Sequence, residues 1–204
     1  MRARTASLLG VAVAALAAAP PALGDDSHAE AMALIKRDFK STGIATLDRL
    51  DEDGVQAVCN RTHDNPAKEI AERLERDQLE TIKYPGEGKL IGDWKSGERI
   101  AQDGRGMTWS DRPGNPGGGS CYNCHQIGPK ETSFGTIGPS LYQFGKLRGQ
   151  GGDVQKYVYG KIYNAKAYNL CSLMPRFGYV GALTPQQIED LVALLLDPNS
   201  PVNQ

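Results

Sequence analysis

The stretch Cys121-Tyr122-Asn123-Cys124-His125 carries the clearest signal in this chain of 204 residues. Two cysteines separated by two residues and followed directly by a histidine form the attachment pattern of c-type haem. On one turn of helix the two thiols can reach the two vinyl groups on one porphyrin edge and become thioethers. The histidine is then carried beneath the macrocycle, where it can bind iron. We therefore predict one covalently bound haem c, held by Cys121 and Cys124, with His125 as an axial ligand.

Two other uses of paired cysteines fit this sequence less well. A thiol–disulfide oxidoreductase also uses C-x-x-C, but the β-α-β setting that it needs is not indicated here. A zinc site of this type needs a second matching pair, and the remaining cysteines, Cys59 and Cys171, stand far apart.

A second axial ligand is expected if the protein transfers electrons. The candidates beyond the first 24 residues are Met32, Met107, Met174, His28 and His63. Met174 is favoured because Pro175 holds an extended loop, which can aim a thioether at the distal face of the iron. We interpret Met32 and Met107 as core residues. His63 is the best rival, although its polar surroundings indicate a surface position.

The segment Ile137-Gly138-Pro139 offers a partner for the outer nitrogen of the axial histidine. A ligating histidine donates that N–H to an acceptor, often a backbone carbonyl, and the carbonyl of Pro139 would suit. With His125 and Met174 both bound, the iron would carry single electrons and would not activate a substrate. Methionine–histidine ligation raises the reduction potential, so the site would accept electrons from mild reductants.

The start of the chain has the features of a secretory leader, which we assign to residues 1–24. Arg2 and Arg4 precede the uncharged apolar run 8–19, and small residues end the segment before Asp25. A membrane anchor is the alternative, but the run is short for a span and Pro20-Pro21 interrupts it. Export places the protein in a compartment that permits disulfides.

The rest of the chain divides by charge into an acidic extension, residues 25–95, and a slightly basic haem domain, residues 96–204. Helical spacing dominates both parts and no alternating strand pattern is evident, so the fold is predicted to be all-α. Expected helices begin at Asn65-Pro66 and span 98–104 and 153–164. The last one begins at Thr184, with Gln187 closing a capping box. The formal charge of −1 and the lack of a basic tract argue against a nucleic-acid partner.

Cys59 and Cys171 are left over from the haem motif. Two spare thiols in an oxidising compartment pair more often than not, and this bond would tie the extension to the loop of Met174. An intermolecular bond or a free thiol are the alternatives.

Several strings together resemble one family, the monohaem cytochrome c subunits of the Sox thiosulfate-oxidising system (SoxX), within the class I cytochromes c. The resemblance extends through nearly the whole chain after the leader and is carried by the segments 43–50, 92–95, 121–127, 134–141, 174–178 and 196–203. It implies a class I cytochrome c haem domain with an N-terminal helical extension.

The resemblance also implies a place in a periplasmic complex. In that family the subunit forms a heterodimer, SoxAX, with a larger haem subunit, SoxA. The complex is an L-cysteine S-thiosulfotransferase, which oxidatively conjugates thiosulfate to a cysteine of the carrier protein SoxYZ. This chain would pass electrons to a downstream acceptor, without being catalytic alone and without a membrane partner. A freely diffusing cytochrome c and a haem sensor or gas binder are the alternatives.

The region from Lys130 to Arg176 carries seven basic and two acidic residues. These are either solvated side chains that offset the haem propionates, or a docking face and local field for an anionic partner.

Overall fold

The computed structural model describes residues 24–86, 90–114 and 117–204, so the predicted leader lies outside it up to residue 23. Within these residues the chain is all-α, as predicted, and no strand is present apart from an isolated bridge between Thr42 and Ala45. The α-helices are α1 (Gly24–Asp38), α2 (Gly54–Arg61), α3 (Lys68–Glu80), α4 (Trp94–Gln102), α5 (Phe144–Arg148), α6 (Gly152–Tyr163) and α7 (Pro185–Leu196). The 3₁₀ helices are η1 (Leu47–Leu50), η2 (Cys121–Asn123), η3 (Ala165–Ala167) and η4 (Pro201–Asn203).

The described part of the chain divides into two compact units, one that ends at Phe39 and one that begins at Lys40. The first unit contains α1, whose last turn carries Lys36 and Arg37, the charges that a helix C-terminus favours. All other helices belong to the second unit, so residues 40–95 fold together with the predicted haem domain. Among the described residues, none of the helices combines the length and apolar character that a bilayer span requires.

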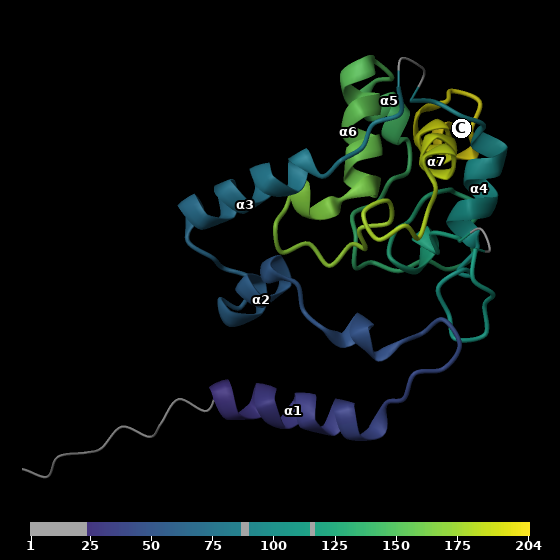
Figure 1. Ribbon diagram of the computed structural model, residues 1–204. Coiled ribbons are helices and arrows are strands. Elements are labelled where there is room, and N and C mark those ends of the chain that lie inside the picture. Colours follow the sequence, from purple (N-terminus) through teal and green to yellow (C-terminus); the bar gives the residue numbers. More distant parts are fainter. Residues whose placement is uncertain (1–23, 87–89, 115–116) are drawn as a thin grey trace, which may run out of the picture. The chain divides into compact units, whose positions relative to one another are not determined.

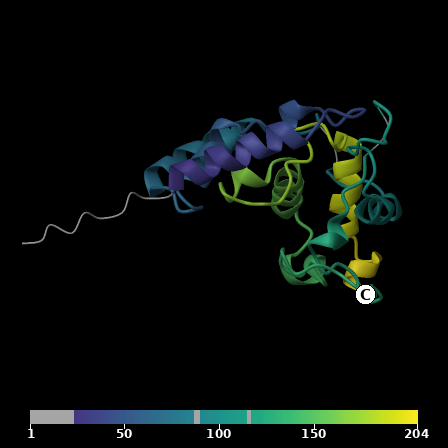
Figure 2. The same cartoon turned by 90° about the horizontal axis from the view of Figure 1, so that it is seen from below.

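Helix α7 is the centre of the second unit and lies between α4 on one side and α5 and α6 on the other (Figure 1 and Figure 2). Its residues 191–196 are all buried. The crossing with α4 is close, because a Cβ at Gly97 would lie 2.1 Å from the carbonyl oxygen of Asp190. A glycine at this position therefore permits the two backbones to touch.

The start of α7 is the one that the sequence predicts. The Thr184 side chain accepts a hydrogen bond from the backbone N–H of Gln187 at 3.2 Å, and the Gln187 side chain accepts from the N–H of Thr184 at 3.0 Å. Pro185 occupies the first helical position, where its missing N–H costs nothing.

Two other helix starts differ from the predictions. Helix α4 begins at Trp94, before the expected residue 98, because the Asp93 carboxylate caps the free N–H groups of Lys95 and Ser96. Helix α3 begins at Lys68, two residues after Pro66. The chain leaves α2 through His63 and Asp64, which both have positive φ, so the following residues form an extended connection before α3 can begin.

A second, smaller core lies beside the main one. Its buried members are Val55, Cys59 and Leu170, and its half-buried members are Ala71, Leu74 and Cys171. Helices α2 and α3 therefore pack on the chain segment that leads to Met174.

Candidate functional site

The C-x-x-C-H motif forms a single tight turn. Cys121–Asn123 is the 3₁₀ helix η2, and the backbone N–H of His125 donates to the carbonyl of Cys121 at 2.9 Å. The N–H of Gly138 donates to the carbonyl of Cys124 at 2.8 Å. The turn is thereby joined to the segment that contains Pro139.

His125 is fixed by that segment. Its Nδ1 lies 2.7 Å from the carbonyl oxygen of Pro139. A carbonyl can only accept, so Nδ1 carries the proton and Nε2 keeps its lone pair for a metal. Gly138 lies against the ring, because a Cβ there would be 2.1 Å from His125 Cε1. The predicted acceptor therefore lies at hydrogen-bonding distance from the outer nitrogen of the imidazole.

Cys121 and Cys124 are free thiols and both are half-buried. Burial raises the pKa of the Cys121 thiol to about 12. A C-x-x-C pair that exchanges disulfides instead has a lowered thiol pKa, often with a helix N-terminus beneath it. The environment of Cys121 thus disfavours the oxidoreductase alternative.

Met174 is half-buried and packs against the same main core as Cys121. Its backbone N–H donates to Ser172 Oγ at 3.2 Å, and the chain around it is neither helix nor strand, as predicted. Of the rival ligands, His63 is exposed. Met107 is 39 % exposed, so our interpretation of it as a core residue is wrong. Met107 lies in a loop, where its carbonyl accepts from Arg49 at 2.7 Å.

Large apolar side chains stand directly beside both candidate ligand segments. Ile137, before Gly138 and Pro139, is 76 % exposed, and Leu173, before Met174, is 82 % exposed. An apolar macrocycle bound by these segments would remove such surface from water. Two free thiols, an imidazole with a free Nε2 and a loop thioether complete a donor set that fits c-type haem.

A disulfide joins Cys59 of α2 to Cys171, at a sequence separation of 112. It fixes the segment just before Met174 to the part of the chain that we interpret as the acidic extension.

Two basic residues of the region 130–176 turn inward. Lys166 is 8 % exposed, and the Arg176 side chain is 9 % exposed and forms an ion pair with Asp53. The basic run is therefore not one solvated surface. Asp53 is not among the predicted site residues, although its position three residues before Gln56 indicates a capping box, which the structure contains.

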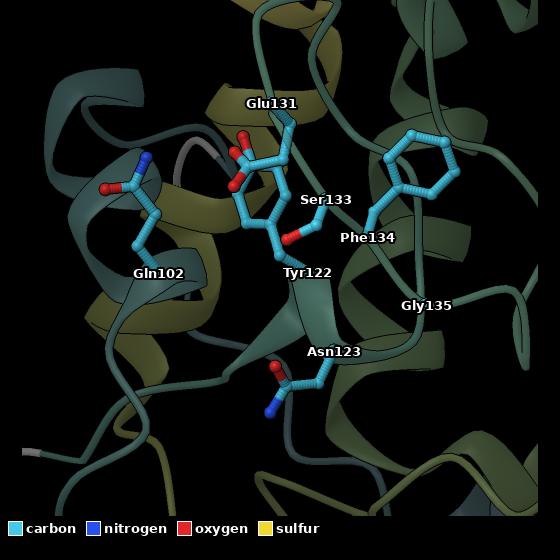
Figure 3. A pocket seen from close by; sticks show the side chains of 7 residues that line it. All are labelled: Gln102, Tyr122, Asn123, Glu131, Ser133, Phe134 and Gly135. Atoms are coloured by element: carbon cyan, nitrogen blue, oxygen red, sulfur yellow. The ribbon is translucent and has the colours of Figure 1, made fainter.

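An open pocket of about 450 Å³ is lined in part by Tyr122 and Asn123 of the motif. Figure 3 shows that polar groups dominate it, with Tyr122 beside Glu131 and with Gln102 and Asn123 nearby. Burial raises the pKa of Tyr122 to about 12, and the charge of Glu131 adds to the shift. Among the described residues that line this pocket, none is a thiol or a candidate ligand of iron.

Comparisons with known proteins found similar chains in a relative and in a solved structure. No family model matches this sequence. An uncharacterised lipoprotein of Aquifex aeolicus (strain VF5) is 42 % identical over 132 residues, which cover 63 % of this chain and 61 % of the relative. The chain thus spans less than two thirds of the length of this curated relative. A chain in the crystal structure of SoxXA from P. pantotrophus is 29 % identical with a TM-score of 0.37, covering 52 % of this chain and 82 % of that one.

Proposed function

We propose that this chain is a periplasmic c-type cytochrome, the electron-accepting subunit of a SoxAX complex. The observation that carries the cytochrome assignment is the 2.7 Å contact between His125 Nδ1 and the Pro139 carbonyl. It orients the imidazole beside two free thiols and leaves Nε2 available to iron.

Each residue of the donor set has a defined task. Haem, when bound, supplies reversible exchange of one electron. Cys121 and Cys124 would hold its edge, and the hydrogen bond to Pro139 would make the imidazole of His125 a stronger donor. Met174 would supply a thioether, which favours a higher reduction potential. With His125 and Met174 both engaged, this set of residues would serve electron transfer and not substrate binding.

The number of electrons released in thiosulfate conjugation indicates that this chain has a supporting role. The carrier thiol loses its proton, a bond forms between its sulfur and the outer sulfur of thiosulfate, and two electrons leave. A one-electron centre cannot take both at once, so a partner must bind the substrate and share the electrons. This chain would also lack an activated thiol, because Cys59 and Cys171 are joined and both Cys121 and Cys124 would be consumed as haem thioethers.

The partner assignment is supported by the sequence strings around the motif, which resemble SoxX. The C-x-x-C-H motif alone supports only a c-type cytochrome, since it is common to cytochromes of many kinds.

Two variants test the ligand set in the holoprotein. Met174→Leu should abolish the near-infrared band of sulfur–iron ligation and lower the reduction potential, and Met107→Leu should change neither. Persistence of the band in Met174→Leu would refute the assignment of Met174.

A reconstitution tests the complex. The purified chain, mixed with thiosulfate, an electron acceptor and a carrier thiol, should give no conjugate by mass spectrometry. Conjugate should form once the larger haem subunit is added. If the chain is instead a freely diffusing carrier, it should purify without a haem partner. Adding it to the larger haem subunit should then leave the amount of conjugate formed by that subunit unchanged.

A further inference from the structure

The loop of Met174 is held at its start by residues from much earlier in the chain. The backbone N–H of Leu170 donates to Glu75 Oε1 of α3 at 2.9 Å, across 95 positions of sequence. The next residue, Cys171, is joined to Cys59 of α2.

The loop is also held by the buried side chain of Lys166. Lys166 Nζ donates to the carbonyl oxygens of Leu170 at 3.0 Å and of Ser172 at 3.4 Å. These bonds fix the two backbone positions on either side of Cys171.

Arg176 fixes the other end of the loop, two residues after Met174. Its guanidinium donates to the Asp53 carboxylate and, at 3.4 Å, to Gln78 Oε1. The guanidinium carbon also lies 4.4 Å from the centre of the Tyr179 ring, a cation–π contact.

Asp53 is a rigid partner for this guanidinium. Its Oδ1 accepts from the N–H groups of Val55 at 3.0 Å and Gln56 at 2.8 Å, so the carboxylate is already fixed as the cap of α2. Gln78 is buried, and its Oε1 also accepts from Asn164 at 3.0 Å. Both acceptors are thus held in position by hydrogen bonds to residues other than Arg176.

Between these two ends, Met174 packs against the main core, while its two neighbours in the loop face solvent. Leu173 and Pro175 are exposed, and the ligand side chain lies on irregular backbone between them. A ligand on a loop binds more tightly when the loop is ordered in advance, because less conformational entropy is lost on ligation.

We propose that Arg176, held by Asp53 and Gln78, is a positioning residue that keeps the Met174 thioether ready to ligate iron. The inference rests on the proposed function, and it assigns Asp53 and Gln78 a supporting role at the haem site. Removing the guanidinium frees one end of the loop, so an external ligand should displace Met174 more easily.

The test is an imidazole titration of the oxidised holoprotein, followed by the visible spectrum and the near-infrared band. Arg176→Gln should bind imidazole at least about tenfold more tightly than the wild type, which corresponds to about 1.4 kcal/mol. Asp53→Asn, which retains a capping oxygen, should shift the affinity in the same direction. Arg73→Gln, an exposed arginine of α3, is the matched control and should leave the affinity unchanged.

A double-mutant cycle separates positioning from general damage to the fold. In a Met174→Ala background no thioether competes with imidazole, so Arg176→Gln should cause no further change in affinity. An equal effect in both backgrounds, or no effect in either, would overturn the proposal. Absence of the near-infrared band from the wild type would instead refute the proposed function, so the two failures are distinguishable.

Discussion

The two segments that carry His125 and Met174 are held in opposite ways. His125 and its acceptor Pro139 are 14 residues apart, and the turn that supports them is closed by its own backbone. The loop of Met174 has one local support, Lys166, but its other anchors are side-chain hydrogen bonds to residues 95 to 123 positions away and a disulfide. One half of the site is local in sequence, and the other depends on the whole of the second unit.

This difference predicts how the site comes apart. Local turns can form with little loop closure, whereas contacts between distant residues form only when the intervening chain is folded. We therefore expect methionine ligation to be lost before histidine ligation as the protein is destabilised.

The largest expected effect comes from removing the disulfide. Cys59→Ser combined with Cys171→Ser should lower the free energy of unfolding by about 2–5 kcal/mol, because the unfolded chain is no longer cross-linked. Urea denaturation of the holoprotein should show the near-infrared band disappearing before helix content. Simultaneous loss of both signals, with an unchanged free energy of unfolding, would mean that the disulfide does not support the loop of Met174.

The second prediction concerns the segment that supports His125. Gly138→Ala places a Cβ where the His125 ring lies, so the ring or the backbone of Pro139 must shift. We expect a loss of about 1–3 kcal/mol and a lower yield of protein with covalent haem, measured by denaturation and by mass spectrometry. Gly128→Ala is the control, because the nearest atom to its Cβ would be the Tyr122 hydroxyl oxygen at 3.6 Å. Normal haem content in Gly138→Ala would show that the ring does not depend on this close approach.

The same difference explains what could be predicted from the sequence. The haem motif, the acceptor Pro139 and the cap at Thr184 depend on neighbouring residues, and each has a counterpart in the structure. The pairing of Cys59 with Cys171 was expected by elimination, and that disulfide is present.

The role of Arg176 could not be predicted in this way. Its sequence neighbourhood is a basic run, which we interpreted as either solvated side chains or a docking face, and only the fold places Asp53 and Gln78 beside it. Helix α3 began later than predicted for a related reason, since the two left-handed residues His63 and Asp64 redirect the chain after α2.

The smallest expected effect is a loss of support for the loop of Met174 at low pH. Burial opposes the charge of Asp53, but hydrogen bonds from Gln56, Arg176 and Val55 outweigh it and hold the pKa of that carboxyl below its usual value. The unfolded chain therefore binds more protons in acid than the folded one does. The stability that Asp53 contributes is complete above its unfolded pKa, about 3.9, and is lost as pH falls through the lower folded value.

Asp103 provides the comparison for this last prediction. The Arg105 guanidinium lowers the pKa of Asp103 to about 2, so this carboxyl also loses stabilising contacts in acid, but it lies outside the loop of Met174. Urea denaturation between pH 7 and pH 2.5 should show the gap between wild type and Asp53→Asn shrinking below about pH 4. The near-infrared band should weaken in acid in the wild type and already be weaker at pH 7 in Asp53→Asn, whereas Asp103→Asn should leave it unchanged. If both variants weaken the band equally, Met174 depends on overall stability and not on the ion pair of Asp53 with Arg176.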